Sequence, residues 1–153
     1  MIQGAVLALS TACAAPPRAN EPPTLATVLA LVDSFHVAFA AEDTARLGRL
    51  ISDDSSMVFY GTSASELQRG RAAFLAKHQA QDWAQLDSIS FTAPADVNAQ
   101  VSGDQALITY HTQLGFVAGG QAGSLPLRMT LSFHREGGTW RIRQGAAAEV
   151  GGD

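Results

Sequence analysis

MVFYGTSASELQRG, residues 57–70, is the stretch across which the character of the chain changes. Its first four residues are apolar and of types that suit a half-buried strand. Gly61 allows the backbone to leave that strand in a tight turn, and Gly70 marks the point where the turn meets a helical pattern. Before this stretch the apolar residues recur at helical spacing, and after residue 86 they alternate as in strands. The stretch therefore joins a helical half to a sheet half.

Three helices are predicted from the spacing of apolar residues. The first spans residues 24–42 and has Thr24 placed to cap its N-terminus. A shorter one begins near Asp43 and ends before the turn-forming residues 52–56. The third is predicted over residues 71–81, with these side chains close to the core: Ala72, Ala73, Leu75 and Ala76.

Beyond residue 86 the apolar residues recur every second position. Residues 86–101 are predicted as an edge strand that bends at Pro94, because proline cannot donate to a sheet ladder. Three further strands are predicted over 105–117, 125–134 and 139–149, with a glycine-rich loop at 118–124. Alternation assigns one apolar face to the interior, and it includes Tyr110, Leu114, Met129, Phe133, Trp140, Ile142, Gln144, Ala146 and Ala148. The fold class is α+β, with helices on one side of the sheet.

Length, charge and hydropathy exclude several classes of protein. A chain of 153 residues makes one domain of ordinary size. Its net charge of -4 comes from charges scattered singly, so no basic stripe for nucleic acid is present. Without a run of 18 apolar residues, no membrane-spanning helix is predicted either.

Residues 1–23 are interpreted as a leader and a proline-rich tether, and residues 24–150 as the domain. Residues 5–9 are apolar and small residues follow, as in a secretory signal, although the basic start is missing. Cys13 lies in a segment similar to a bacterial lipobox, where it would carry a lipid. Export to the periplasm or a lipid anchor is expected, and a cytoplasmic chain with an unstructured leader is the alternative.

The order of these features resembles the SnoaL-like branch of the nuclear-transport-factor-2-like superfamily. The resemblance rests on Gly61, Thr62, Glu66 and Gly70, and on Gly-x-Trp-x-Ile at 138–142. It implies a cone-shaped, cystatin-like fold, in which three N-terminal helices pack on a strongly curved mixed or antiparallel sheet around a cavity. It also implies a homodimer through the outer sheet face. Members include isomerases, cyclases, dehydratases and noncatalytic binding or assembly domains.

The candidate site residues follow from which face each side chain occupies. The pocket for a small apolar ligand is predicted to include Phe39, Tyr110, Leu114, Met129, Phe133 and Gln144. Because the inner faces of the last three strands carry no Asp, Glu or His, a noncatalytic binding domain is the leading hypothesis. The alternatives are an isomerase, cyclase or dehydratase that uses His36 with Tyr60 or Tyr110, and an assembly module that works through the outer face.

The other ionisable residues are given structural roles. Glu66 is expected to satisfy backbone N–H groups of a turn, and His78 to be a solvated or rim residue. The alternation of side chains along their strands predicts that His111 and His134 point to the outer face of the sheet. The four histidines show no metal-ligand spacing, so neither a metal nor a cofactor is predicted.

Overall fold

The computed structural model describes residues 23–151, which form four helices and seven strands. The helices are α1 (Leu25–Ala40), α2 (Thr44–Leu50), α3 (Arg71–Ala80) and the short α4 (Asp82–Gln85). Thr24 caps α1 as predicted, because its side chain accepts from the Thr27 N–H. Asp43 caps α2 in the same way, through the N–H of Arg46. The three predicted helices are confirmed, and α4 adds one turn after the third.

The strands form one mixed sheet in the order β2-β1-β7-β6-β5-β3, with β4 also paired to β5. Among the described strands, only β1 and β7 pair in parallel, and the other strand pairs are antiparallel. The strand bounds are Val58–Tyr60 for β1, Leu67–Arg69 for β2, Ser88–Phe91 for β3, Ala95–Ser102 for β4, Gln105–Ala118 for β5, Gln121–Glu136 for β6 and Thr139–Glu149 for β7. The predicted bend at Pro94 separates β3 from β4, and both lie along the same edge of β5.

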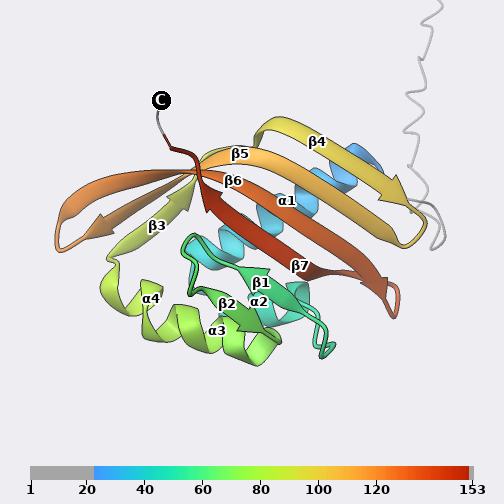
Figure 1. Ribbon diagram of the computed structural model, residues 1–153, viewed down its shortest axis with the longest axis horizontal. Coiled ribbons are helices and arrows are strands. Elements are labelled where there is room, and N and C mark those ends of the chain that lie inside the picture. Colours follow the sequence, from blue (N-terminus) through green and yellow to red (C-terminus); the bar gives the residue numbers. More distant parts are fainter. Residues whose placement is uncertain (1–22, 152–153) are drawn as a thin grey trace, which may run out of the picture.

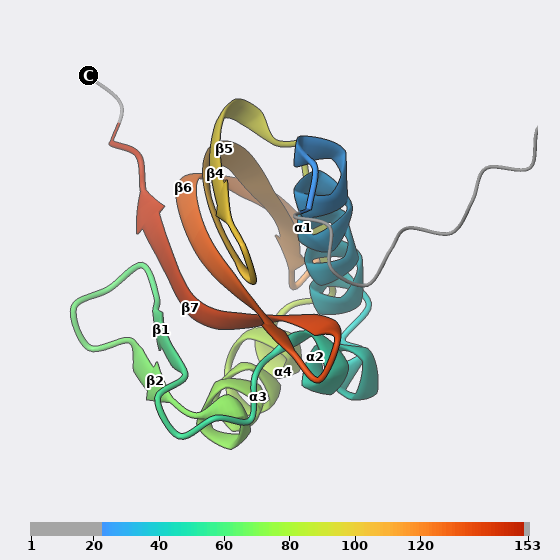
Figure 2. The ribbon, with the colours of Figure 1, turned by 90° about the vertical axis from the view of Figure 1, so that its right-hand side faces the viewer.

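The sheet curves around the helices, as Figure 1 shows. Turned by 90°, Figure 2 shows α1 running along the concave side of β4, β5 and β6, while α2, α3 and α4 lie below with β1 and β2. The helix side of the sheet holds the apolar core, which includes Val28, Val32 and Phe35 of α1 and Ile108, Leu131 and Ile142 of the strands. The predicted α+β class and curved sheet are confirmed.

Two segments differ from the prediction because of turns. Residues 62–70 were expected to lead directly into a helix, but residues 67–69 form β2, which pairs with β1 as a short hairpin. The glycine-rich loop expected at 118–124 is instead a tight turn at Gly119 and Gly120, whose φ angles are 55° and 76°. Glycine adopts such angles without a steric penalty, so β6 can begin immediately at Gln121.

A bulge in β7 reverses the alternation predicted for the end of that strand. Phe133 of β6 pairs with Ile142, and the preceding Ser132 pairs with Gln144, so Arg143 is an extra residue in the ladder. Ile142 and Gly145 are therefore buried, whereas Gln144 is exposed on the outer face. The predicted inward placement of Gln144 is corrected by this single inserted residue, because a shift of one position exchanges the two faces of a strand.

The leader, the tether and Cys13 lie outside the described residues. Among the helices that the structure does describe, none is both long and apolar enough to cross a membrane.

Candidate functional site

A cavity of about 240 Å³ opens between the concave side of the sheet and helices α1, α3 and α4. Its walls are mainly aromatic and aliphatic, and six phenylalanines contribute: Phe35, Phe39, Phe59, Phe74, Phe91 and Phe116. The strands β5, β6 and β7 add Leu114, Leu125, Leu127, Met129 and Ala147, none of which is ionisable. An apolar cavity of about 150 Å³ accommodates benzene, so this one has room for a molecule with two fused rings.

The predicted pocket residues are divided by the structure. Phe39, Leu114 and Met129 line the cavity. Tyr110 and Phe133 point inward as expected, but both are fully buried in the core beside it. Gln144 lies on the outer face, for the reason given above.

His36 and Tyr110 are brought together, yet away from the cavity wall. A hydrogen bond of 2.8 Å joins His36 Nε2 to the Tyr110 hydroxyl, and the imidazole stacks on Phe91 with a centroid distance of 4.3 Å. Burial lowers the pKa of His36 from 6.5 to about 4 against the raising effect of Asp33, and burial also raises the pKa of Tyr110. Both groups are neutral at pH 7, and each is the hydrogen-bond partner of the other. Neither lines the cavity, so the catalytic use of this pair stays a prediction.

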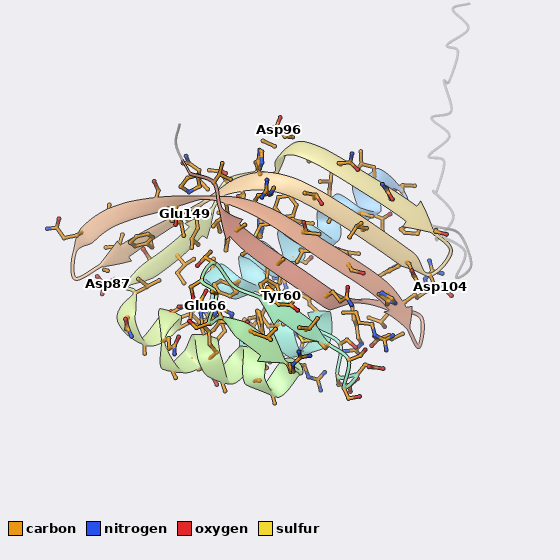
Figure 3. The ribbon with its side chains drawn as sticks, in the orientation of Figure 1. Tyr60, Glu66, Asp87, Asp96, Asp104 and Glu149 are labelled. Atoms are coloured by element: carbon orange, nitrogen blue, oxygen red, sulfur yellow. The ribbon has the colours of Figure 1, made fainter. Side chains whose placement is uncertain are left out.

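Tyr60, the third predicted catalytic residue, lies apart from this pair. It is 52% exposed and belongs to a hollow on the outer sheet face with Leu107, Thr130 and Gln144. Figure 3 shows it on β1, beside β7.

The polar part of the cavity is centred on His78. This residue is only 8% exposed, so the expectation of a solvated or rim position is wrong. Its Nδ1–H donates to Asp82, one helical turn onward at the start of α4. The other ring nitrogen, Nε2, is buried and has no hydrogen-bond partner among the described residues. The imidazole ring packs edge-on against the rings of Phe39 and Phe74, at centroid distances of 4.8 and 4.4 Å.

Lys77 connects Asp82 to a second carboxylate. Its ammonium lies 3.2 Å from Asp82 Oδ2 and 3.1 Å from Glu66 Oε1. Burial raises the pKa of Asp82, but the hydrogen bond from His78 and the charge and hydrogen bond of Lys77 outweigh it and hold that pKa below its ordinary value. The pKa of Glu66 is also lowered: partial burial opposes this, while bonds from Ser63 N–H and Lys77 bring it about. Both carboxylates are therefore ionised at neutral pH.

Gly61 explains how Glu66 reaches this position. A Cβ at residue 61 would lie 2.3 Å from Glu66 Oε2, so only glycine leaves room for the carboxylate. There Glu66 accepts from Ser63 N–H and from the Thr62 hydroxyl, each at 3.2 Å. The predicted role of Glu66 in a turn is confirmed, although the turn joins β1 to β2. Figure 3 shows Glu66 between α3 and the sheet.

A second histidine–aspartate pair lies on the opposite surface and provides a contrast. His111 Nδ1 is 3.0 Å from Asp96 Oδ2, and both side chains are exposed to water. Within residues 23–151 there is no group of three His, Cys, Asp or Glu side chains that is suited to a metal ion.

The sequence carried a signal for His78 that the prediction did not use. The third helix was oriented by its alanines, but Ala72, Ala73 and Ala76 are exposed. Phe74 is the only aromatic residue on α3 and is its most buried apolar side chain. A residue four positions later shares its helical face, and that residue is His78.

Comparisons with known proteins place this geometry in a wider group. No curated protein matches the chain in sequence. A nuclear transport factor 2-like protein from Salmonella enterica has a similar structure, with a TM-score of 0.74 and 12% identity over 82% of this chain and 89% of the other. A putative dehydratase of the NTF2-like family from Streptomyces avermitilis has a TM-score of 0.72 and 22% identity, over 82% of this chain and 94% of the other.

A third solved structure is an NTF2-like protein with a cystatin-like fold from Novosphingobium aromaticivorans, with a TM-score of 0.69 and 21% identity over 82% of this chain and 81% of that one. At such identities these likenesses establish the fold alone. The sequence itself matches the family model of the SnoaL-like domain over residues 28–147. Because that match spans most of the chain, and the curved sheet and its cavity agree with it, the protein belongs to the SnoaL-like domain family.

Proposed function

We propose that the cavity binds a small apolar molecule and that His78, oriented by Asp82, acts on that molecule as a general base. The observation that carries this proposal is His78 Nε2, which lies buried at the cavity wall with no hydrogen-bond partner among residues 23–151. The reaction class is that of a cofactor-independent isomerase, cyclase or dehydratase.

The chemistry follows from the tautomer that Asp82 selects. An ionised carboxylate can only accept, so His78 keeps its proton on Nδ1 and directs a lone pair from Nε2. That lone pair can take a proton from an acidic carbon, and the electrons of the C–H bond remain on the substrate as an enolate. Asp82 then stabilises the imidazolium, as the aspartate of a catalytic triad does.

Two products are available from such an enolate without an added oxidant or reductant. Return of the proton to a different carbon gives an isomer. Alternatively, a neighbouring C–O bond breaks, and the departing hydroxide takes the proton from the imidazolium to leave as water, which restores neutral His78. The Streptomyces structure described as a putative dehydratase is consistent with the second route.

Noncatalytic binding is the second candidate function. The many phenylalanines favour it, as does the absence of Asp, Glu and His among the cavity-lining residues of the described strands β5, β6 and β7. In that case His78 would only accept a hydrogen bond from the ligand.

Deuterium exchange separates these two functions. 2-Tetralone is a neutral two-ring ketone with acidic C–H bonds next to its carbonyl group. In D2O, catalytic amounts of the protein should accelerate its gain of mass, measured by mass spectrometry. His78→Gln should lower the accelerated rate by roughly 100-fold or more, which is the usual contribution of general base catalysis.

His111→Gln is the matched control, because it also removes a histidine bonded to an aspartate, but on the outer surface. It should exchange at the wild-type rate. If tetralone binds and no acceleration occurs, or if both variants behave alike, the catalytic proposal fails and the binding function remains.

We also propose that two copies pair through the outer sheet face and that the chain is exported. The pairing is supported by the exposed Tyr60 and Leu107, which border a hollow of about 390 Å³ on that face. The export is supported by the apolar leader and by the lipobox-like segment around Cys13.

A further inference from the structure

The cavity contains a second buried polar atom that has no partner. Gln68 is 5% exposed, and its Oε1 is buried without a hydrogen bond from any described residue. Gln68 lies at the centre of β2, opposite Phe59, and lines the cavity. Its neighbours Leu67 and Arg69 are exposed instead. An unpaired acceptor inside a protein is costly, so this residue is expected to have a partner when the cavity is occupied.

The charges around the cavity restrict the net charge of the ligand that supplies this partner. Lys77 supplies one positive charge, whereas Glu66 and Asp82 supply two negative ones. Neutral His78 leaves the group with a surplus negative charge, and protonated His78 balances it. A ligand with a carboxylate or phosphate would therefore be repelled in the resting state, while a neutral ligand would not be.

The apolar walls of the cavity restrict the shape of the ligand. Aromatic rings prefer edge or offset contacts with other rings, and six phenylalanines surround a volume of about 240 Å³. A flat molecule of one or two rings fits these walls better than a long flexible chain.

We propose that the cavity selects an uncharged ring compound bearing a hydroxyl group, and that this hydroxyl donates its hydrogen bond to Gln68 Oε1. This inference rests on the proposed use of the cavity as the ligand site, and it assigns Gln68 to specificity. With the hydroxyl held by Gln68, a different part of the ligand faces His78.

Three probes of one shape test the assignment by isothermal titration calorimetry. 2-Naphthol offers a donor, 2-methoxynaphthalene has the same rings without a donor, and 2-naphthoate is an anion. The wild-type protein should bind 2-naphthol about tenfold more tightly than the methoxy compound, the usual effect of one hydrogen bond. It should bind 2-naphthoate most weakly.

Gln68→Met keeps an unbranched side chain of similar length and removes the acceptor. It should reduce the preference for naphthol to less than about threefold, while the affinity for 2-methoxynaphthalene stays unchanged. Arg69→Gln, on the exposed side of the same strand, is the control and should keep the wild-type preference. A second readout needs no substitution: with each probe at saturation, the Gln68 side-chain amide signals in NMR spectra should shift further with naphthol than with the methoxy compound.

Equal affinity for naphthol and its methyl ether would overturn the inference, as would a preference that survives in Gln68→Met. Binding of none of the three probes would overturn it together with the ligand-binding part of the proposed function. A preference for naphthol without deuterium exchange in tetralone would support this inference and remove only the catalytic part.

Discussion

Within residues 23–151, three histidines form side-chain hydrogen bonds, and their surroundings give them different chemistry. His36 is stacked on Phe91 and bonded to Tyr110 in the core. His78 is bonded to Asp82 and has one free nitrogen at the cavity. His111 is bonded to Asp96 in water. Residue type alone therefore does not identify the base: a carboxylate that fixes the tautomer and a free nitrogen in a cavity are both required, and of the three only His78 combines them.

The buried His36 should make stability depend on pH. Its pKa is lowered by burial from 6.5 to about 4, so between these values the unfolded chain binds the proton and the folded protein does not. The contribution of His36 to the free energy of unfolding is therefore complete above pH 6.5 and is lost as the pH falls from 6.5 towards 4. Between pH 7 and pH 5 this histidine should account for a loss of about 2 kcal/mol, measured by urea unfolding at each pH.

His36→Gln should lack that part of the pH dependence. Tyr110→Phe is the matched comparison, since it removes the same hydrogen bond but keeps the buried imidazole, and its pH dependence should stay close to that of the wild type. If the two variants have the same slope of stability against pH, burial of His36 is not the cause.

At the scale of elements, the inward faces of β5 and β6 were predictable, whereas β7 was predicted over the correct residues but with the wrong faces beyond Ile142. Alternation over residues 105–117 and 125–134 correctly assigned the inward side chains, because a two-residue period follows directly from strand geometry. The extra residue Arg143 in β7 leaves no mark in that pattern, since both Gln144 and Ala146 are acceptable on either face. Phe59 requires Gly145 to be inward, and this constraint comes from a strand more than 80 residues away.

The candidate site was predicted in part for a similar reason. Much of the apolar wall comes from the sheet, whose periodicity is readable, and the side chains that β5, β6 and β7 contribute to the cavity include no Asp, Glu or His. The prediction that the inner face carries none of these residues is wrong at one position, because the bulge brings Glu149 opposite the inward Leu127 at the exposed end of β7. The polar groups come from the β1–β2 hairpin, α3 and α4, where short elements carry little periodic signal. Glu66 and Lys77 are 11 residues apart, and only the tertiary fold brings them within 3.1 Å.

Two glycine substitutions test the packing of Phe59 against β7. A Cβ at residue 145 would lie 2.2 Å from the Phe59 ring, which is buried and cannot move aside. Gly145→Ala should therefore lower the free energy of unfolding by about 1–3 kcal/mol through overpacking. Gly48→Ala is the control, because nothing lies within 4 Å of a Cβ there and the residue is in α2.

Gly48→Ala should raise stability by about 0.5–1 kcal/mol, the gain expected from a better helix former. Urea unfolding of both variants measures the two effects in opposite directions. A neutral or stabilising Gly145→Ala would contradict the packing of Phe59 across β7, and with it the inward position that the bulge gives to residue 145.

At the scale of the whole molecule, the two sides of the sheet have different tasks. The concave side provides an apolar cavity, and in the described part of the chain its charged and amide side chains come from α3, α4 and the β1–β2 hairpin. The outer side has polar and small residues with a few exposed apolar ones, among them Tyr60 at 52% and Leu107 at 41%. Because the cavity opens away from this outer face, a partner bound there would leave the ligand site accessible.

Pairing of two copies through that outer face predicts a mass of twice 16.0 kDa by light scattering of the full chain. Leu107→Lys places a charge beside the hollow, and burying an unpaired charge in an interface is strongly unfavourable, so this variant should be a monomer. Val37→Lys is the control: Val37 is 45% exposed on α1, on the helix side of the sheet, and its replacement should leave the dimer intact. A monomeric wild type, or a Leu107→Lys variant that still elutes as a dimer, would exclude this face as the interface. Because Leu107 does not line the cavity, the monomeric variant should exchange deuterium into tetralone at the wild-type rate, which would separate assembly from chemistry.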